Sequence, residues 1–164
     1  EYSYACGLFG STLGVLGAGA IACEMIRRAS AFGMPVVLWS RRFNGRDGAM
    51  SPAEADALGL GPAARATTIE LAPSPEELAG RADILSIHLA LGSETRGLVN
   101  AAVLGRLKPG SCVINTARGE VVDYAALRDA IREKGLRAGL DVYASEPASS
   151  AGVFEDAIVQ EPGV

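Results

Sequence analysis

The sequence contains few of the residues from which metal sites and disulfide frameworks are built. It has one histidine and three cysteines among 164 residues. The cysteines, Cys6, Cys23 and Cys112, are far apart and odd in number, so they show neither a disulfide framework nor a metal-ligand spacing. We therefore expect three small buried side chains in a reducing compartment, the cytoplasm.

Clusters of positive charge and long apolar runs are also lacking. The net charge is −4 and no run of lysine and arginine stands out, which argues against nucleic acid and anionic membrane surfaces as partners. No apolar stretch approaches the roughly 20 residues of a membrane-spanning helix, and no signal peptide is visible. Hydrophobic residues make up 49% of the chain and charged residues 21%, which is typical of a globular domain with a buried core.

Strand-like and helix-like segments alternate along the whole chain. This alternation is typical of a parallel sheet that is covered by helices on both faces, a doubly wound α/β fold. The expected strands are residues 12–16, 35–40, 66–69, 83–89, 111–115 and 136–142. The expected helices are residues 20–32, 52–58, 100–107, 123–134 and a short helix that a capping box from Ser74 to Glu77 opens.

A glycine turn lies between the first expected strand and the first expected helix. The sequence GAGAIA at residues 17–22 follows the apolar run, and a second apolar run comes after the helix. Gly17 permits a tight turn, and Gly19 lacks a Cβ, so the backbone can approach phosphate groups that the helix N-terminus attracts. This unit predicts a Rossmann-type dinucleotide-binding site, whereas the alternative is an ordinary tight turn. The candidate cofactor-binding residues of the turn are Gly17, Gly19, Ala20 and Ile21.

The second expected strand ends in Ser40-Arg41-Arg42. Enzymes that use NAD place a carboxylate at this point, where it accepts hydrogen bonds from the adenosine ribose and would repel a 2′-phosphate. A hydroxyl and two guanidinium groups instead bind a 2′-phosphate through charge-assisted hydrogen bonds. We therefore predict a cofactor site at Ser40, Arg41 and Arg42 with a preference for NADP. The alternative is that the arginines face solvent and that NAD is used.

Three further strings lie at expected strand ends, where open α/β sheets bind ligands. They are IHLAL with ETRGL at residues 87–98, NTARGEVVD at residues 115–123 and LDVYASEP at residues 140–147. Together with the glycine turn, they resemble the D-2-hydroxyacid dehydrogenase family, which includes phosphoglycerate dehydrogenase and the glyoxylate/hydroxypyruvate reductases. The resemblance covers essentially the whole chain. It implies hydride transfer between a nicotinamide cofactor and a D-2-hydroxy acid or 2-keto acid.

The resemblance also implies roles for two charged residues. Arg118 matches the arginine that binds the substrate carboxylate and the C2 oxygen, for which a guanidinium fork is well suited. Glu146 matches the glutamate that pairs with the catalytic histidine and holds it in the right protonation state. The family places that histidine in a TPHIG-like string, which would lie beyond residue 164. We therefore expect residues 1–164 to be the dinucleotide-binding domain of a larger enzyme, inactive without its general base.

Four more residues match positions around the nicotinamide. Thr116 and Ala117 match residues that line its ribose, and Asp141 matches an aspartate that faces the carboxamide. His88, the only histidine, matches a wall of the cofactor pocket and not the acid/base. The structural alternatives are a capping role for Arg118 and a strand-end turn for Asp141. The resemblance further implies a homodimer formed through this domain.

Two rival functions share these features. A cofactor-sensing module similar to the transcriptional corepressors of the C-terminal-binding-protein type would have the same fold and the same NTARG and SEP strings. A degenerate stand-alone nucleotide-binding domain would also keep the glycine turn. No residue in the sequence identifies which hydroxy acid is the substrate.

Overall fold

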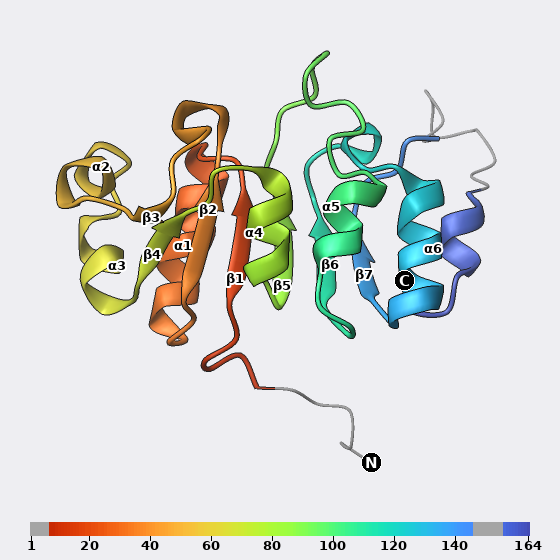
Figure 1. Cartoon of the computed structure of the whole chain (residues 1–164), viewed down its shortest axis with the longest axis horizontal. Helices are drawn as coiled ribbons and strands as arrows, with labels where there is room; N and C mark the ends of the chain where they lie inside the picture. Colours follow the sequence, from red (N-terminus) through yellow and green to blue (C-terminus); the bar gives the residue numbers. More distant parts are fainter. Residues whose placement is uncertain (1–6, 146–155) are drawn as a thin grey trace.

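The computed structural model describes residues 7–145 and 156–164, and its central feature is a seven-stranded sheet (Figure 1). The strands are β1 (Leu13–Leu16), β2 (Val36–Trp39), β3 (Gly48–Ala49), β4 (Ile69–Leu71), β5 (Ile84–Ile87), β6 (Cys112–Asn115) and β7 (Arg137–Leu140). Their order across the sheet is β3-β4-β2-β1-β5-β6-β7. All neighbours are parallel except β3, which pairs antiparallel with β4 at the edge.

Helices cover both faces of this sheet, which confirms the doubly wound α/β fold. They are α1 (Ala20–Ala31), α2 (Pro52–Ala57), α3 (Gly61–Ala66), α4 (Pro75–Arg81), α5 (Ala101–Arg106) and α6 (Tyr124–Lys134), with 3-10 turns η1 (Arg41–Phe43), η2 (Gly119–Val121) and η3 (Ala157–Gln160). One buried cluster joins α1, α2 and α3 to the sheet, and the other joins α4, α5 and α6 to the opposite face. Figure 1 shows α4 and α5 in front of the sheet and α1 behind it.

The first two strands are buried along their whole length, as expected for strands that helices cover on both sides. Successive side chains of a strand point to opposite faces. Accordingly Val15 belongs to the cluster with α1, whereas its neighbour Leu16 belongs to the cluster with α4 and α6. Both residues have no exposed surface. The apolar run that predicted the strand therefore reflects two separate cores.

Side-chain caps begin most of these helices. Asp123 accepts a hydrogen bond from the Ala126 N–H at the start of α6, and Gly135 ends this helix with a left-handed conformation. Ser51 and Glu54 form a complete capping box on α2, and these Ser51 contacts together with Arg46 lower the pKa of Glu54 to about 2. Ser74 accepts a hydrogen bond from the Glu77 N–H, which is one half of the capping box that the sequence predicted.

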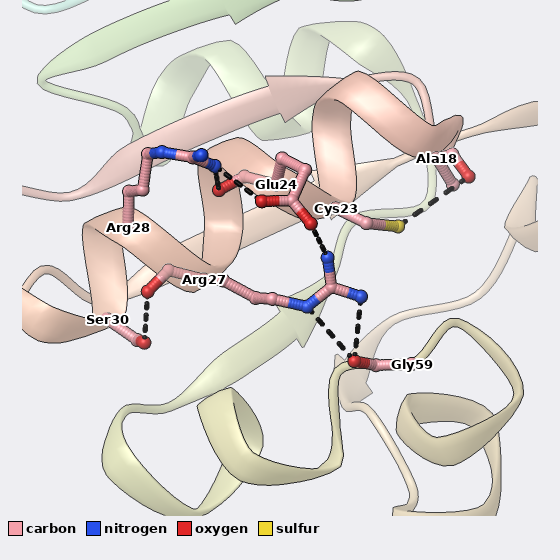
Figure 2. Close-up of polar contacts among 7 residues, drawn as sticks. All are labelled: Ala18, Cys23, Glu24, Arg27, Arg28, Ser30 and Gly59. Carbon is pink, nitrogen blue, oxygen red and sulfur yellow. Dashed lines mark hydrogen bonds and ion pairs between the residues drawn. The ribbon is translucent and has the colours of Figure 1, made fainter.

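The segment between β2 and α4 differs from the prediction. The strand expected at residues 66–69 is wrong, because β4 is Ile69–Leu71 and residue 66 ends α3. Helix α3 and strand β3 were both missed. Long-range contacts position this region. The Arg27 guanidinium on α1 donates two hydrogen bonds, of 3.2 and 2.9 Å, to the Gly59 carbonyl oxygen before α3 (Figure 2).

The strand order changes direction next to β1. From β1 the chain adds β2 and then β4 on one side of the sheet, and it adds β5, β6 and β7 on the other. A crevice forms at such a switch point, outside the carboxyl ends of the strands, because the connections on the two sides run over opposite faces. The turn from β1 into α1 lies at this point. The fold therefore places the glycine turn where open α/β sheets bind ligands.

Candidate cofactor and substrate site

Gly17 begins the turn between β1 and α1 in a conformation that requires glycine. Its φ is +110°, and a Cβ at this position would lie 2.5 Å from the carbonyl oxygen of His88. The Gly17 N–H donates a hydrogen bond of 2.8 Å to the Trp39 carbonyl oxygen at the end of β2. The turn therefore fits tightly between the ends of β2 and β5.

Gly19, at the N-cap of α1, faces open space instead. Among residues 7–145 and 156–164, no atom lies within 4 Å of the position that its Cβ would occupy, and no side chain caps the helix. The thiol of Cys23, one turn along α1, lies 4.0 Å from the Ala18 carbonyl oxygen and supports the turn from inside (Figure 2). The free N–H groups of the first helical turn and the positive end of the helix dipole suit a phosphate group here.

A cleft of about 520 Å³ starts at this helix and crosses the carboxyl ends of β5 and β6. Residues 20–22, 88–91 and 116–118 line it together with Gly19. The predicted site residues that it brings together are Gly19, Ala20, Ile21, His88, Thr116, Ala117 and Arg118. Ala22, Leu89, Ala90 and Leu91 also line the cleft. They belong to the glycine turn and to the IHLAL string, but they were not among the predicted site residues.

His88 forms part of the cleft wall. Its Nε2 lies 2.9 Å from the Ser86 hydroxyl, and its backbone N–H donates to the Leu16 carbonyl oxygen at 2.8 Å. Burial lowers the pKa of His88 below its usual range, so the imidazole is neutral at pH 7. Because the His88 ring is neutral and lies against Ser86 of β5, it suits a packing role in the cleft wall better than proton transfer.

The loop that carries Arg118 is built on a buried asparagine. Asn115 is fully buried at the end of β6, its Nδ2 donates to the Arg118 carbonyl oxygen at 2.9 Å, and its Oδ1 accepts from the Ala117 N–H at 3.0 Å. The Arg118 side chain is exposed, and its Nη1 donates to the Ala117 carbonyl oxygen at 2.6 Å. Within residues 7–145 and 156–164 the other guanidinium N–H groups have no hydrogen-bond partner, so they can hold a carboxylate in the cleft.

Gly119 brings this loop against the segment that follows β7. A Cβ on Gly119 would lie 2.1 Å from the carbonyl carbon of Tyr143 and 2.2 Å from the backbone nitrogen of Ala144. Asp141 is exposed at the end of β7, and its N–H donates to the Asn115 carbonyl oxygen at 3.0 Å. The NTARG and LDVY strings are therefore neighbours in space. Glu146 lies outside the described residues.

Residues 40–42 at the end of β2 are not among the residues that line the cleft. Ser40 is 7% exposed, and its hydroxyl has no hydrogen-bond partner among the residues that the structure describes, which is uncommon for a buried polar group. The guanidinium carbon of Arg42 lies 5.4 Å from the centre of the Phe43 ring. Arg41 pairs with Glu94, a residue that sequence reasoning missed, with 2.6 Å between Nη1 and Oε2. A carboxylate is therefore present at this site, although it comes from another loop.

Two kinds of feature are missing from the described part of the chain. Residues 7–145 and 156–164 contain no group of three or more histidine, cysteine or acidic side chains that could hold a metal ion. No helix among these residues has both the length and the apolar character needed to cross a membrane.

The chain resembles proteins of known activity over most of its length. It is 42% identical over 149 residues to D-3-phosphoglycerate dehydrogenase of Mycobacterium tuberculosis, a match that covers 90% of this chain and 25% of that protein. It is 36% identical over 156 residues to 4-methyl-2-oxopentanoate reductase A of Aspergillus oryzae, covering 94% of this chain and 40% of the relative. The chain thus spans less than half the length of these relatives.

The fold has the same relatives. The crystal structure of the apo form of Rhodotorula graminis D-mandelate dehydrogenase superposes with a TM-score of 0.71 at 34% identity, covering 90% of this chain and 39% of that one. Residues 2–159 match the family described as D-isomer specific 2-hydroxyacid dehydrogenase, NAD binding domain. The glycine turn, the cleft and the exposed Arg118 thus occur in a chain that belongs to the D-isomer specific 2-hydroxyacid dehydrogenase family, as its NAD-binding domain.

Proposed function

We propose that this chain is the nucleotide-binding domain of an oxidoreductase that transfers hydride between NADP(H) and a D-2-hydroxy acid or 2-keto acid. The observation that carries this proposal is the single cleft that joins the N-terminus of α1 to Arg118. One end suits a pyrophosphate and the other suits a carboxylate. Family membership and the names of the relatives support the same reaction.

Each side chain then has a definite task. When bound, the nicotinamide accepts or supplies the hydride at C2 of the substrate. Gly19 and the first turn of α1 bind the pyrophosphate, while His88 and Thr116 line the cleft beside the cofactor. Arg118 holds the substrate carboxylate and so orients C2 toward the ring. The assigned roles of Asp141, facing the carboxamide, and Glu146, supporting a histidine, belong to this proposal as well.

The preference for NADP rests on the end of β2. Ser40 has a buried hydroxyl without a hydrogen-bond partner in the described part of the chain, and two exposed arginines follow it. Titration of the protein with NADPH and NADH, followed by calorimetry, tests this preference. NADPH is expected to bind more tightly, and Arg41→Ala should weaken NADPH while leaving NADH nearly unchanged. Equal or tighter binding of NADH to the parent protein would contradict the proposed preference.

The reaction itself is tested in the full-length protein, because the relatives are longer than this chain. Glyoxylate, hydroxypyruvate, phosphohydroxypyruvate and bulkier 2-keto acids are supplied with NADPH, and loss of NADPH absorbance is followed. Turnover of at least one of them is expected. Failure of all of them, together with cofactor-dependent capture of a partner protein, would favour the corepressor alternative instead.

A homodimer and a cytoplasmic location complete the proposal. Met25 on α1 and Phe32 at its C-cap lie on the same side of the helix and are 37% and 58% exposed, an apolar surface that a second copy could cover. Sedimentation of the protein should show a dimer that Phe32→Glu dissociates, and a parent protein that sediments as a monomer would contradict this. The free thiols of Cys23 and Cys112 fit the reducing cytoplasm.

A further inference from the structure

The ion pair between Arg41 and Glu94 joins two loops on either side of the glycine turn. Arg41 opens η1 after β2, and Glu94 lies in the loop after β5, 53 residues along the chain. Strand β1 lies between β2 and β5 in the sheet. Because neighbouring strands are about 4.8 Å apart, the two loops start about 10 Å apart. The pair therefore spans the carboxyl end of β1, where the turn begins.

The Glu94 side chain projects from a loop whose backbone is held in place. The adjacent Thr95 is 5% exposed, and its hydroxyl donates to the Ala90 carbonyl oxygen at 2.7 Å and accepts from the Gly92 N–H at 2.8 Å. The side chains of Glu94 and Arg41 are 70% and 71% exposed. A loop with fixed backbone thus presents a solvated carboxylate to a solvated guanidinium, and such a pair exchanges partners at little cost.

We propose that Glu94 is a specificity-determining residue that lowers the preference for NADP over NAD. This inference rests on the proposed 2′-phosphate site at residues 40–42. A 2′-phosphate can bind Arg41 only if the guanidinium leaves Glu94, and the phosphate charge then lies near a free carboxylate. An unphosphorylated ribose needs no such exchange.

The groups around Arg41 explain why Glu94 weakens the binding of NADP only in part. Ser40 offers a hydroxyl that no described residue engages in a hydrogen bond. Arg42 lies over the Phe43 ring, and no carboxylate pairs with it within residues 7–145 and 156–164, so a phosphate need not displace an acidic partner to bind it. Glu94 therefore competes for one of the two arginines only. The preference for NADP persists, but it is smaller than two free guanidinium groups would provide.

The test replaces the carboxylate with its neutral isostere. Glu94→Gln is titrated by calorimetry with NADPH and NADH, and with 2′,5′-ADP and 5′-AMP, which carry the adenosine half alone. NADPH and 2′,5′-ADP should bind about three- to fivefold more tightly, as expected when one exposed ion pair is removed. NADH and 5′-AMP should change by less than about twofold. Glu133→Gln, an equal change of charge on exposed α6 surface, should alter none of the four affinities.

A double variant shows whether the effect of Glu94→Gln on NADPH binding depends on Arg41. In Arg41→Ala protein, Glu94→Gln should no longer improve NADPH binding, because the competing contact is already absent. The inference is overturned if Glu94→Gln leaves the NADPH to NADH ratio unchanged, if both cofactors gain equally, or if the gain survives without Arg41. These results are distinct from failure of the proposed cofactor preference, in which the parent protein binds NADH at least as tightly. Even in that case, comparing the NADPH to NADH affinity ratio of Glu94→Gln with that of the parent protein still measures the effect of Glu94 on specificity.

Discussion

The carbonyl oxygen of His88 lies 2.5 Å from the point that a Cβ on Gly17 would occupy. The end of β5 therefore packs directly against the backbone of the glycine turn. Gly17 also has a φ of +110°, which other residues rarely adopt. This contact fixes the position at which α1 begins, so it affects both the fold and the cofactor site.

Gly17 and Gly19 should respond differently to alanine. Gly17→Ala introduces backbone strain and a collision with His88, so the free energy of unfolding should fall by about 2 kcal/mol or more. Gly19→Ala places a methyl group in open space and should leave that free energy nearly unchanged. It should weaken cofactor binding on the order of tenfold, because the methyl group keeps the pyrophosphate away from the backbone. Chemical denaturation and cofactor titration separate the two effects, and a Gly19→Ala variant with undiminished affinity would argue against a phosphate at this turn.

Gly119→Ala should destabilise the protein strongly. The new Cβ would collide with backbone atoms of Tyr143 and Ala144, which cannot move aside as a flexible side chain can. We expect a loss of about 2 kcal/mol or more in the free energy of unfolding. Gly105→Ala in α5 is the matched control, because a Cβ there meets open space and alanine favours a helix by about 0.5–1 kcal/mol. Equal stability of the two variants in thermal melts would contradict the close packing of Gly119.

Arg118→Lys should impair catalysis without affecting the fold. Lysine keeps the positive charge but loses the fork that holds a carboxylate with two hydrogen bonds. The value of kcat/KM for a 2-keto acid in the full-length protein should fall roughly 100-fold, about 2.7 kcal/mol. Cofactor affinity and melting temperature should stay the same, since the Arg118 side chain is exposed. Arg96→Lys, on an exposed arginine 3.9 Å from Glu120, serves as the control and should retain full activity.

His88 should make stability depend on pH in a narrow range. Burial lowers the pKa of His88 in the folded protein, so the unfolded chain binds more protons below its own pKa of about 6.5. Stability from the neutral ring is therefore complete above that pH and decreases as the pH falls. As the chain has one histidine, a single imidazole resonance should titrate in NMR spectra with a midpoint below about 6.5.

The matched variant His88→Gln isolates this contribution. Its free energy of unfolding should vary less than that of the parent between about pH 7 and 5. The carboxylates with lowered pKa values, such as Glu54, contribute stability that is lost only below about pH 4.3, so they do not interfere. Identical slopes for parent and variant would show that His88 is not buried in its neutral form.

Local patterns predicted the elements that bracket the site. The apolar run of β1, the glycine turn and the caps of α6 each depend on residues a few positions apart, which is the distance that periodicity and capping rules cover. The prediction was wrong at residues 66–69 and missed α3, because a short helix without a side-chain cap has little local signal. Its place depends on contacts such as the one from Arg27 to Gly59.

The sequence by itself determined the fold class and the residues at each strand end. Strand burial, turn geometry and the dehydrogenase-like strings each depend on residues that are close together in the sequence. Only the tertiary structure decided which of those residues meet. The strand order brings Gly17 against His88, and it brings Gly119 against Tyr143. It also sets Glu94 beside Arg41, although no acidic residue lies next to Arg41 in the sequence. Such contacts depend on how segments that are distant in the sequence pack across the sheet. Local sequence patterns carry no information on that packing.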